Sequence, residues 1–205
     1  MSARAALAAG ALAAPLFVVV ALAQALTRDG FDLTRQPVSM LSNGDLGWIQ
    51  ISSFAVTGLL SIAAAYGLRG LTPWAPRLLV LIGAGLLIAA AFRLDSATTM
   101  SRQAIVHNVG GSLSFFSMIA LCFVLARHFP PRWARTGRIA AIAFAALLLW
   151  AMTGGRAGAL TLFVGVALAW GWISATSGIL LRRTYGYRPG SALMPAAGAA
   201  TKLDA

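Results

Sequence analysis

The chain has 205 residues, of which 59% are hydrophobic and only 10% are charged. This balance, with a mean hydropathy of +0.80, excludes an ordinary soluble domain, in which about a quarter of the residues are charged, and it indicates a membrane protein. The net charge of +11 does not indicate nucleic-acid binding, because the arginines lie at the ends of apolar runs and form no basic stripe with interleaved aromatic residues.

Six apolar runs qualify, or nearly qualify, to cross the roughly 30 Å of membrane hydrocarbon as helices. Long continuous runs favour helices over the short alternating strands of a membrane barrel. We therefore predict an all-α polytopic membrane bundle with six transmembrane helices, at about 5–26, 46–68, 78–94, 103–126, 139–152 and 159–181. The fifth run is short for a span, and an alternative is that its helix begins earlier, inside the preceding loop.

The two ends of the chain need separate interpretation. The first run also resembles a secretory signal, with Arg4 before it and a small-residue "ALAQA" at 21–25. Its length exceeds that of a usual signal core, so an uncut first helix is the working prediction. Residues 1–184 are predicted to form the transmembrane domain, and 185–205, rich in Pro, Gly, Ala and Ser, a disordered cytoplasmic tail.

The distribution of basic residues predicts the orientation. Eleven of the sixteen Lys and Arg residues fall on the side that holds both termini. Because cytoplasmic loops carry the excess of Lys and Arg, we expect both termini to be cytoplasmic. The Arg-rich, Lys-poor and Ala-rich composition suggests a GC-rich bacterial genome. The expected location is a bacterial inner membrane.

The connection "TRDGFDLTRQPVSMLSNGDLG", residues 27–47, is longer than most connections in compact bundles. Its middle mixes apolar residues with polar ones such as Ser39. Two interpretations stay open. The segment either dips into the mouth of the bundle, with a turn at Asn43-Gly44, or is an ordinary loop in which Asp45 caps the second helix.

A second group of polar residues flanks the connection between the third and fourth helices. Arg93 and Asp95 follow the third apolar run, and His107 lies about one turn inside the fourth. A helical hairpin brings them to similar depth. An ionisable residue within a span indicates a functional site by default, although interface anchoring is the alternative. Arg156, in "TGGRAG", is a further candidate for the same cluster.

The sequence predicts no cofactor or metal. His107 and His128 are too far apart along one helix, about 30 Å at 1.5 Å per residue, to hold one haem. Asp45, Asp95 and His107 have the chemistry of zinc ligands but no diagnostic spacing. The chain also lacks zinc-protease, nucleophile-elbow, P-loop and dinucleotide motifs.

The stretches "PVSMLSNGDLGWIQISSF" and "LLVLIGAGLLIAAAFRLDSATTMSRQAIVHNVGG" resemble the bacterial integral-membrane family called domain of unknown function 998. The resemblance covers roughly residues 10–180. Its features fall on Ser39 and Leu41, Gly83 and Gly85, Phe92 and Asp95, and His107. Ser96 and Met40 depart from the residues that the family often has at those positions. The resemblance implies a six- or seven-helix topology and no reaction.

The favoured function is binding of a lipid headgroup, small ligand or membrane-protein partner in an extracytoplasmic polar pocket. The candidate ligand-binding residues are Ser39, Asp45, Arg93, Asp95, His107 and Arg156. A small proton-coupled carrier and a lipid-modifying hydrolase, each using Asp95 and His107, are the alternatives, so enzymatic activity is left open. The expected partner is the lipid bilayer and not nucleic acid, and the oligomeric state is left open.

Overall fold

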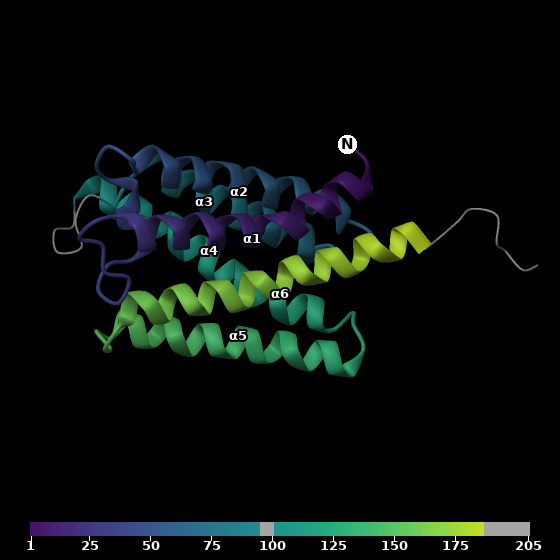
Figure 1. Cartoon of the computed structure of the whole chain (residues 1–205). Coiled ribbons are helices and arrows are strands. Elements are labelled where there is room, and N and C mark those ends of the chain that lie inside the picture. Colours follow the sequence, from purple (N-terminus) through teal and green to yellow (C-terminus); the bar gives the residue numbers. More distant parts are fainter. Residues whose placement is uncertain (95–100, 187–205) are drawn as a thin grey trace, which may run out of the picture.

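The structure, a computed structural model, describes residues 1–94 and 101–186, and all regular structure in these residues is helical. Six α-helices and one short 3₁₀ helix, η1, follow one another along the chain (Figure 1). They are α1 Ala3–Thr27, η1 Val38–Ser42, α2 Gly47–Gly67, α3 Trp74–Ala91, α4 Arg102–Ala126, α5 Pro131–Met152 and α6 Gly158–Gly186. Each α-helix is long and apolar enough to span a membrane. The predicted all-α bundle of six transmembrane helices is therefore confirmed.

Two helices differ from their predicted bounds for local reasons. α5 begins at Pro131 rather than near residue 139, because proline is favoured in the first turn of a helix and the long arginine side chains that follow extend from the apolar segment. α3 begins earlier than predicted, at Trp74, and ends earlier, at Ala91. Arg93 therefore lies beyond this helix, and Asp95 falls outside the described residues.

The six helices form a closed ring. Each helix packs against the next one along the chain, α6 returns to pack against α1, and α4 makes a smaller contact with α6 across the ring. The N-terminus and the last turn of α6 lie at one end, called the terminal end below. The segments 28–46 and 153–157 lie at the opposite end, called the long-loop end (Figure 1).

Glycines allow α2, α3 and α4 to approach closely. A Cβ atom added to Gly83 would lie 2.5 Å from the Gly58 carbonyl oxygen of α2, and one added to Gly110 would lie 2.7 Å from the Gly85 carbonyl oxygen of α3. Small residues at such positions are typical of membrane helix interfaces, where packing rather than the hydrophobic effect drives association. The glycine-rich α3 is thereby fixed between its two neighbours.

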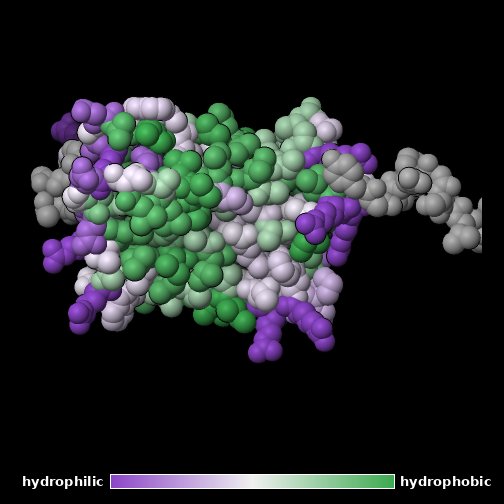
Figure 2. Space-filling view, viewed as in Figure 1, coloured by the Kyte–Doolittle hydropathy of each residue, from purple (hydrophilic) through white to green (hydrophobic). Residues whose placement is uncertain are grey.

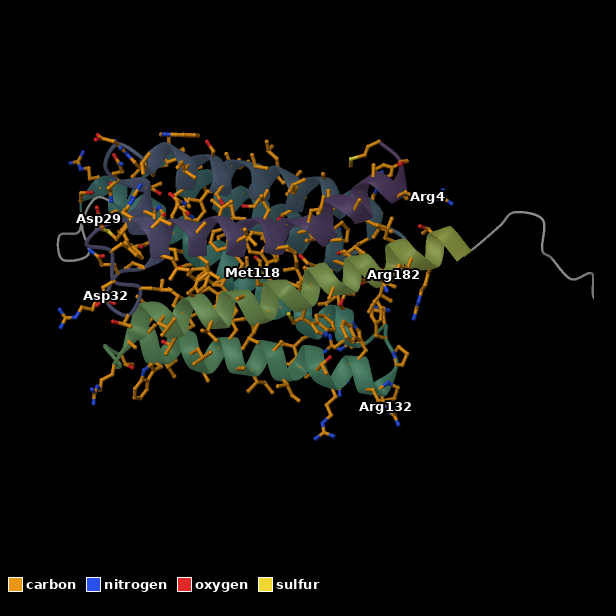
Figure 3. The ribbon with its side chains drawn as sticks, viewed as in Figure 1. Arg4, Asp29, Asp32, Met118, Arg132 and Arg182 are labelled. Atoms are coloured by element: carbon orange, nitrogen blue, oxygen red, sulfur yellow. The ribbon has the colours of Figure 1, made fainter. Side chains whose placement is uncertain are left out.

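The surface has the pattern expected of a protein in a bilayer. Apolar residues cover the middle of the visible face, and the hydrophilic residues gather at its two ends (Figure 2). Arg4, Arg132 and Arg182 lie at the terminal end, and Asp29 and Asp32 at the long-loop end (Figure 3). The apolar band is what a lipid environment requires of the outward helix faces.

Candidate functional site

A cavity of about 380 Å³ lies inside the ring, in the half nearer the long-loop end. All six α-helices contribute to its wall, and the segment before and within η1 covers it. Its lining includes Phe17, Ser39, Phe54, His107, Asn108, Ser112, Met118, Met152 and Trp170. The volume falls in the usual range of small-molecule sites, about 300 to 1,000 Å³.

The deep end of the cavity is apolar and tightly packed. Met118, at the middle of α4, lies between the two halves of the bundle (Figure 3). The Phe17 ring is 5.3 Å from the Trp170 ring and 5.8 Å from the Phe54 ring, measured between centroids. Phe17, Met118 and Trp170 are each at most 4% exposed. Tilted rings at these separations attract one another beyond the effect of their burial. Phe17, Phe54 and Trp170 therefore form a well-packed end of the cavity, called the aromatic floor below.

His107 stands at the polar end of the cavity and is 4% exposed. Its Nδ1 atom is 2.7 Å from the Phe92 carbonyl oxygen. Phe92 adopts an extended conformation just past the end of α3, which leaves this oxygen without a helical partner. A carbonyl oxygen only accepts hydrogen bonds, so Nδ1 is the donor to Phe92, and in its neutral form the ring then keeps a lone pair on Nε2. The Ala89 carbonyl oxygen, about one turn earlier in α3, is a second hydrogen-bond acceptor beside the ring. The Phe54 ring, 6.1 Å away between centroids, packs edge-on against the imidazole.

The exposed lining residues of the cavity lie on α4 and α5, so we infer that it opens between these helices. Asn108 and Ser112 on α4 and Met152 on α5 line the cavity and are also exposed at the molecular surface. Ser112 lies about 15 Å along α4 from its start at 1.5 Å per residue, a depth well inside the apolar band. The opening therefore faces sideways as well as toward the long-loop end.

The long connection forms a packed cover. Leu41 and Ser42 in η1 are fully buried, and the Arg28 Nη1 atom donates to the carbonyl oxygens of Leu41, at 2.7 Å, and Asn43, at 3.0 Å. The Asn43 amide in turn donates to the Leu94 carbonyl oxygen at 2.7 Å. The interpretation in which this segment dips into the bundle mouth thus fits the structure. Asp45 is exposed and does not cap α2, whose N-cap residue is Leu46 without a side-chain hydrogen bond.

A cluster of buried and half-buried polar side chains lies beside this cover and is called the amide cluster. Its members are Gln24, Arg28, Ser42, Gln50 and Ser53. The Gln24 Nε2 atom donates to Gln50 Oε1 at 2.8 Å and so joins α1 to α2. Each member also holds one buried polar atom without a partner. Such atoms cost stability in a folded protein, so this cluster is the least satisfied part of the described interior.

The structure brings together two of the six predicted site residues. Ser39 and His107 line the same cavity. Asp45, Arg93 and Arg156 are exposed and do not line it, and Asp95 lies outside the described residues. The zinc-site alternative and the carrier and hydrolase alternatives all use Asp95 and stay untested. The binding role of all six residues stays a prediction.

The sequence analysis did not select Gln24 of the amide cluster or Asn108 of the cavity wall as candidate site residues. It also did not identify the aromatic floor. An amide within an apolar run was the available signal for Gln24, because such groups in membranes usually hydrogen-bond to another helix. Asn108 follows His107 directly and carried the same signal. Phe17, Phe54 and Trp170 gave none, because an aromatic residue that lines a cavity looks in sequence like one that packs in a core.

The ring of six apolar helices defines a multi-pass membrane protein. The family model described as "Protein of unknown function (DUF998)" matches residues 11–179. The chain belongs to this family, as the sequence resemblance predicted. No curated protein and no solved structure matches the chain.

Proposed function

We propose that this protein binds a single-chain lipophilic molecule in the central cavity, with the chain against the aromatic floor and the polar end near His107. The observation that carries the proposal is the cavity itself, about 380 Å³ in volume and lined mainly by apolar side chains. An empty apolar space of this size would forfeit the dispersion contacts of every residue around it. A hydrocarbon chain restores these contacts.

The dimensions support a chain from one membrane leaflet. From His107 to Met118 the cavity wall rises about 16 Å along α4 at 1.5 Å per residue, which is about half of the roughly 30 Å hydrocarbon thickness. The sideways opening between α4 and α5 gives a chain access from the bilayer. With both termini cytoplasmic, this is the leaflet away from the cytoplasm.

The test uses Trp170 as a reporter at the floor of the cavity. A chain of about twelve carbons, comparable to the roughly 16 Å of the cavity wall, is given a terminal bromine, which quenches indole fluorescence on contact. It is titrated into proteoliposomes that contain the protein. We expect a saturable loss of fluorescence that disappears in Trp170→Phe.

Trp172→Phe is the matched control, because Trp172 lies on the same helix but packs against Gly137 at the terminal end and does not line the cavity. It should keep the saturable loss. Quenching that only grows in proportion to the bromine content of the membrane, equally in both variants, would exclude occupation of the cavity.

A further inference from the structure

We infer that the cavity selects a ligand whose head is an uncharged hydrogen-bond donor, such as a hydroxyl group, and that His107 Nε2 accepts this hydrogen bond. The inference rests on the proposed function and adds the chemistry of the head. It names the class of ligand as long-chain alcohols and related neutral hydroxy-lipids, in contrast to phosphate, carboxylate or ammonium amphiphiles.

The first step is the direction of the hydrogen bond. The Phe92 carbonyl oxygen holds Nδ1 as the donor at 2.7 Å, so the ring offers an acceptor at Nε2. The Ala89 carbonyl oxygen is a second hydrogen-bond acceptor beside the ring. With Nδ1 as the donor to these carbonyl oxygens at the end of α3, Nε2 is left for a ligand in the cavity that His107 lines. A ligand that places a hydroxyl hydrogen at Nε2 satisfies this acceptor, whereas an ether or ester oxygen there does not.

The second step is the charge of the wall. Apart from His107, none of the described residues that line the cavity is ionisable. Transfer of a charged head into such a site without a counter-charge is strongly unfavourable. The rim instead offers the hydroxyl groups of Ser39 and Ser112, which both donate and accept and suit a neutral hydroxyl head.

The experiment compares brominated probes of equal chain length in proteoliposomes, with Trp170 fluorescence as the readout. The probes are the primary alcohol, its methyl ether, the carboxylate and the trimethylammonium salt, each at a known mole fraction in the membrane. One hydrogen bond to a buried acceptor changes affinity by about tenfold. We expect the wild-type protein to bind the alcohol about tenfold more tightly than the ether and the two charged probes most weakly.

Two variants isolate the acceptor. His107→Asn retains an amide that can donate to Phe92 but has no counterpart of Nε2, and His107→Phe removes both. In each, the ratio of alcohol to ether affinity should fall to about one, and this ratio cancels differences in partition into the membrane. Arg93→Ala, outside the cavity wall, should keep the wild-type ratio.

The outcomes separate the inference from the proposed function. Saturable quenching with equal affinities for alcohol and ether, or with a preference for a charged probe, overturns the inference and leaves the proposed function standing. The absence of saturable quenching by every probe overturns the proposed function. An unchanged alcohol-to-ether ratio in both His107 variants overturns the role of Nε2 alone.

Discussion

At the scale of single residues, the amide cluster links α1 and α2 through one side-chain hydrogen bond, from Gln24 to Gln50. Gln50 is fully buried and Gln24 is 7% exposed, so neither amide can exchange its partner for bulk water. Side-chain hydrogen bonds between membrane helices are modest in net value, on average about 0.6 kcal/mol. Removing one partner leaves the other amide buried without a hydrogen bond, and this destabilises the fold by more than the intact hydrogen bond stabilises it.

This asymmetry gives a prediction for the pair. Gln24→Leu should lower the free energy of unfolding by about 1 to 3 kcal/mol, because it leaves the Gln50 amide buried without its partner. Adding Gln50→Leu should restore part of that loss. The measurement is reversible unfolding of the single and double variants in mixed detergent micelles.

The control is Gln103→Leu near the start of α4, which is not fully buried and should change stability little. Equal and additive losses from the two single variants would show that Gln24 and Gln50 contribute independently, contrary to the prediction.

At the scale of helices, the close approach of α3 to α4 depends on glycine. A Cβ atom on Gly85 would collide with the Gly110 carbonyl oxygen and with Ser114, and one on Gly110 would lie 2.7 Å from the Gly85 carbonyl oxygen. Gly85→Ala and Gly110→Ala should therefore each cost about 1 to 3 kcal/mol, as overpacked cores do. Thermal unfolding in detergent, followed by circular dichroism, measures the loss.

The neighbouring Gly111 provides the contrast. A Cβ atom there would come no closer than 3.8 Å to the Phe115 ring. Alanine is also the better helix former, by about 1 kcal/mol. Gly111→Ala should therefore leave stability unchanged or raise it. A loss of the same size at Gly111 as at Gly110 would mean that helix geometry, and not contact between α3 and α4, sets the effect.

The helices also show what the sequence can and cannot predict. Their number and approximate positions follow from apolar length alone, because the bilayer fixes that length. An earlier start of α5 inside the preceding loop was left open, but its exact position at Pro131 could not be predicted, since Arg132, Arg135 and Arg138 interrupt the apolar run that reveals a span. Ser39 and His107 could be selected because they are polar within or beside apolar segments. Their shared cavity could not, because it depends on how six helices close into a ring.

At the scale of the whole molecule, the two ends differ in charge. Described arginines at the terminal end outnumber those at the long-loop end, and Asp29, Asp32 and Asp45 all lie at the long-loop end. Asp32 is a stable anion there, because hydrogen bonds from the Thr34 hydroxyl and backbone N–H hold its pKa below the usual value. Excess Lys and Arg mark the cytoplasmic side, whereas acids contribute little to topology. We therefore expect the terminal end to be cytoplasmic.

Single cysteines test this orientation directly. Cys122 is the only cysteine and is buried, so it is replaced by alanine to give a silent background. Asp29→Cys and Arg132→Cys then place one exposed thiol at each end of the bundle (Figure 3). In intact bacterial cells, with the outer membrane made permeable, a membrane-impermeant maleimide should label the cysteine at position 29 at once. It should label the one at 132 only after the inner membrane is opened. The reverse order would place the cavity opening in the cytoplasmic leaflet and would require its lipid ligand to come from that side.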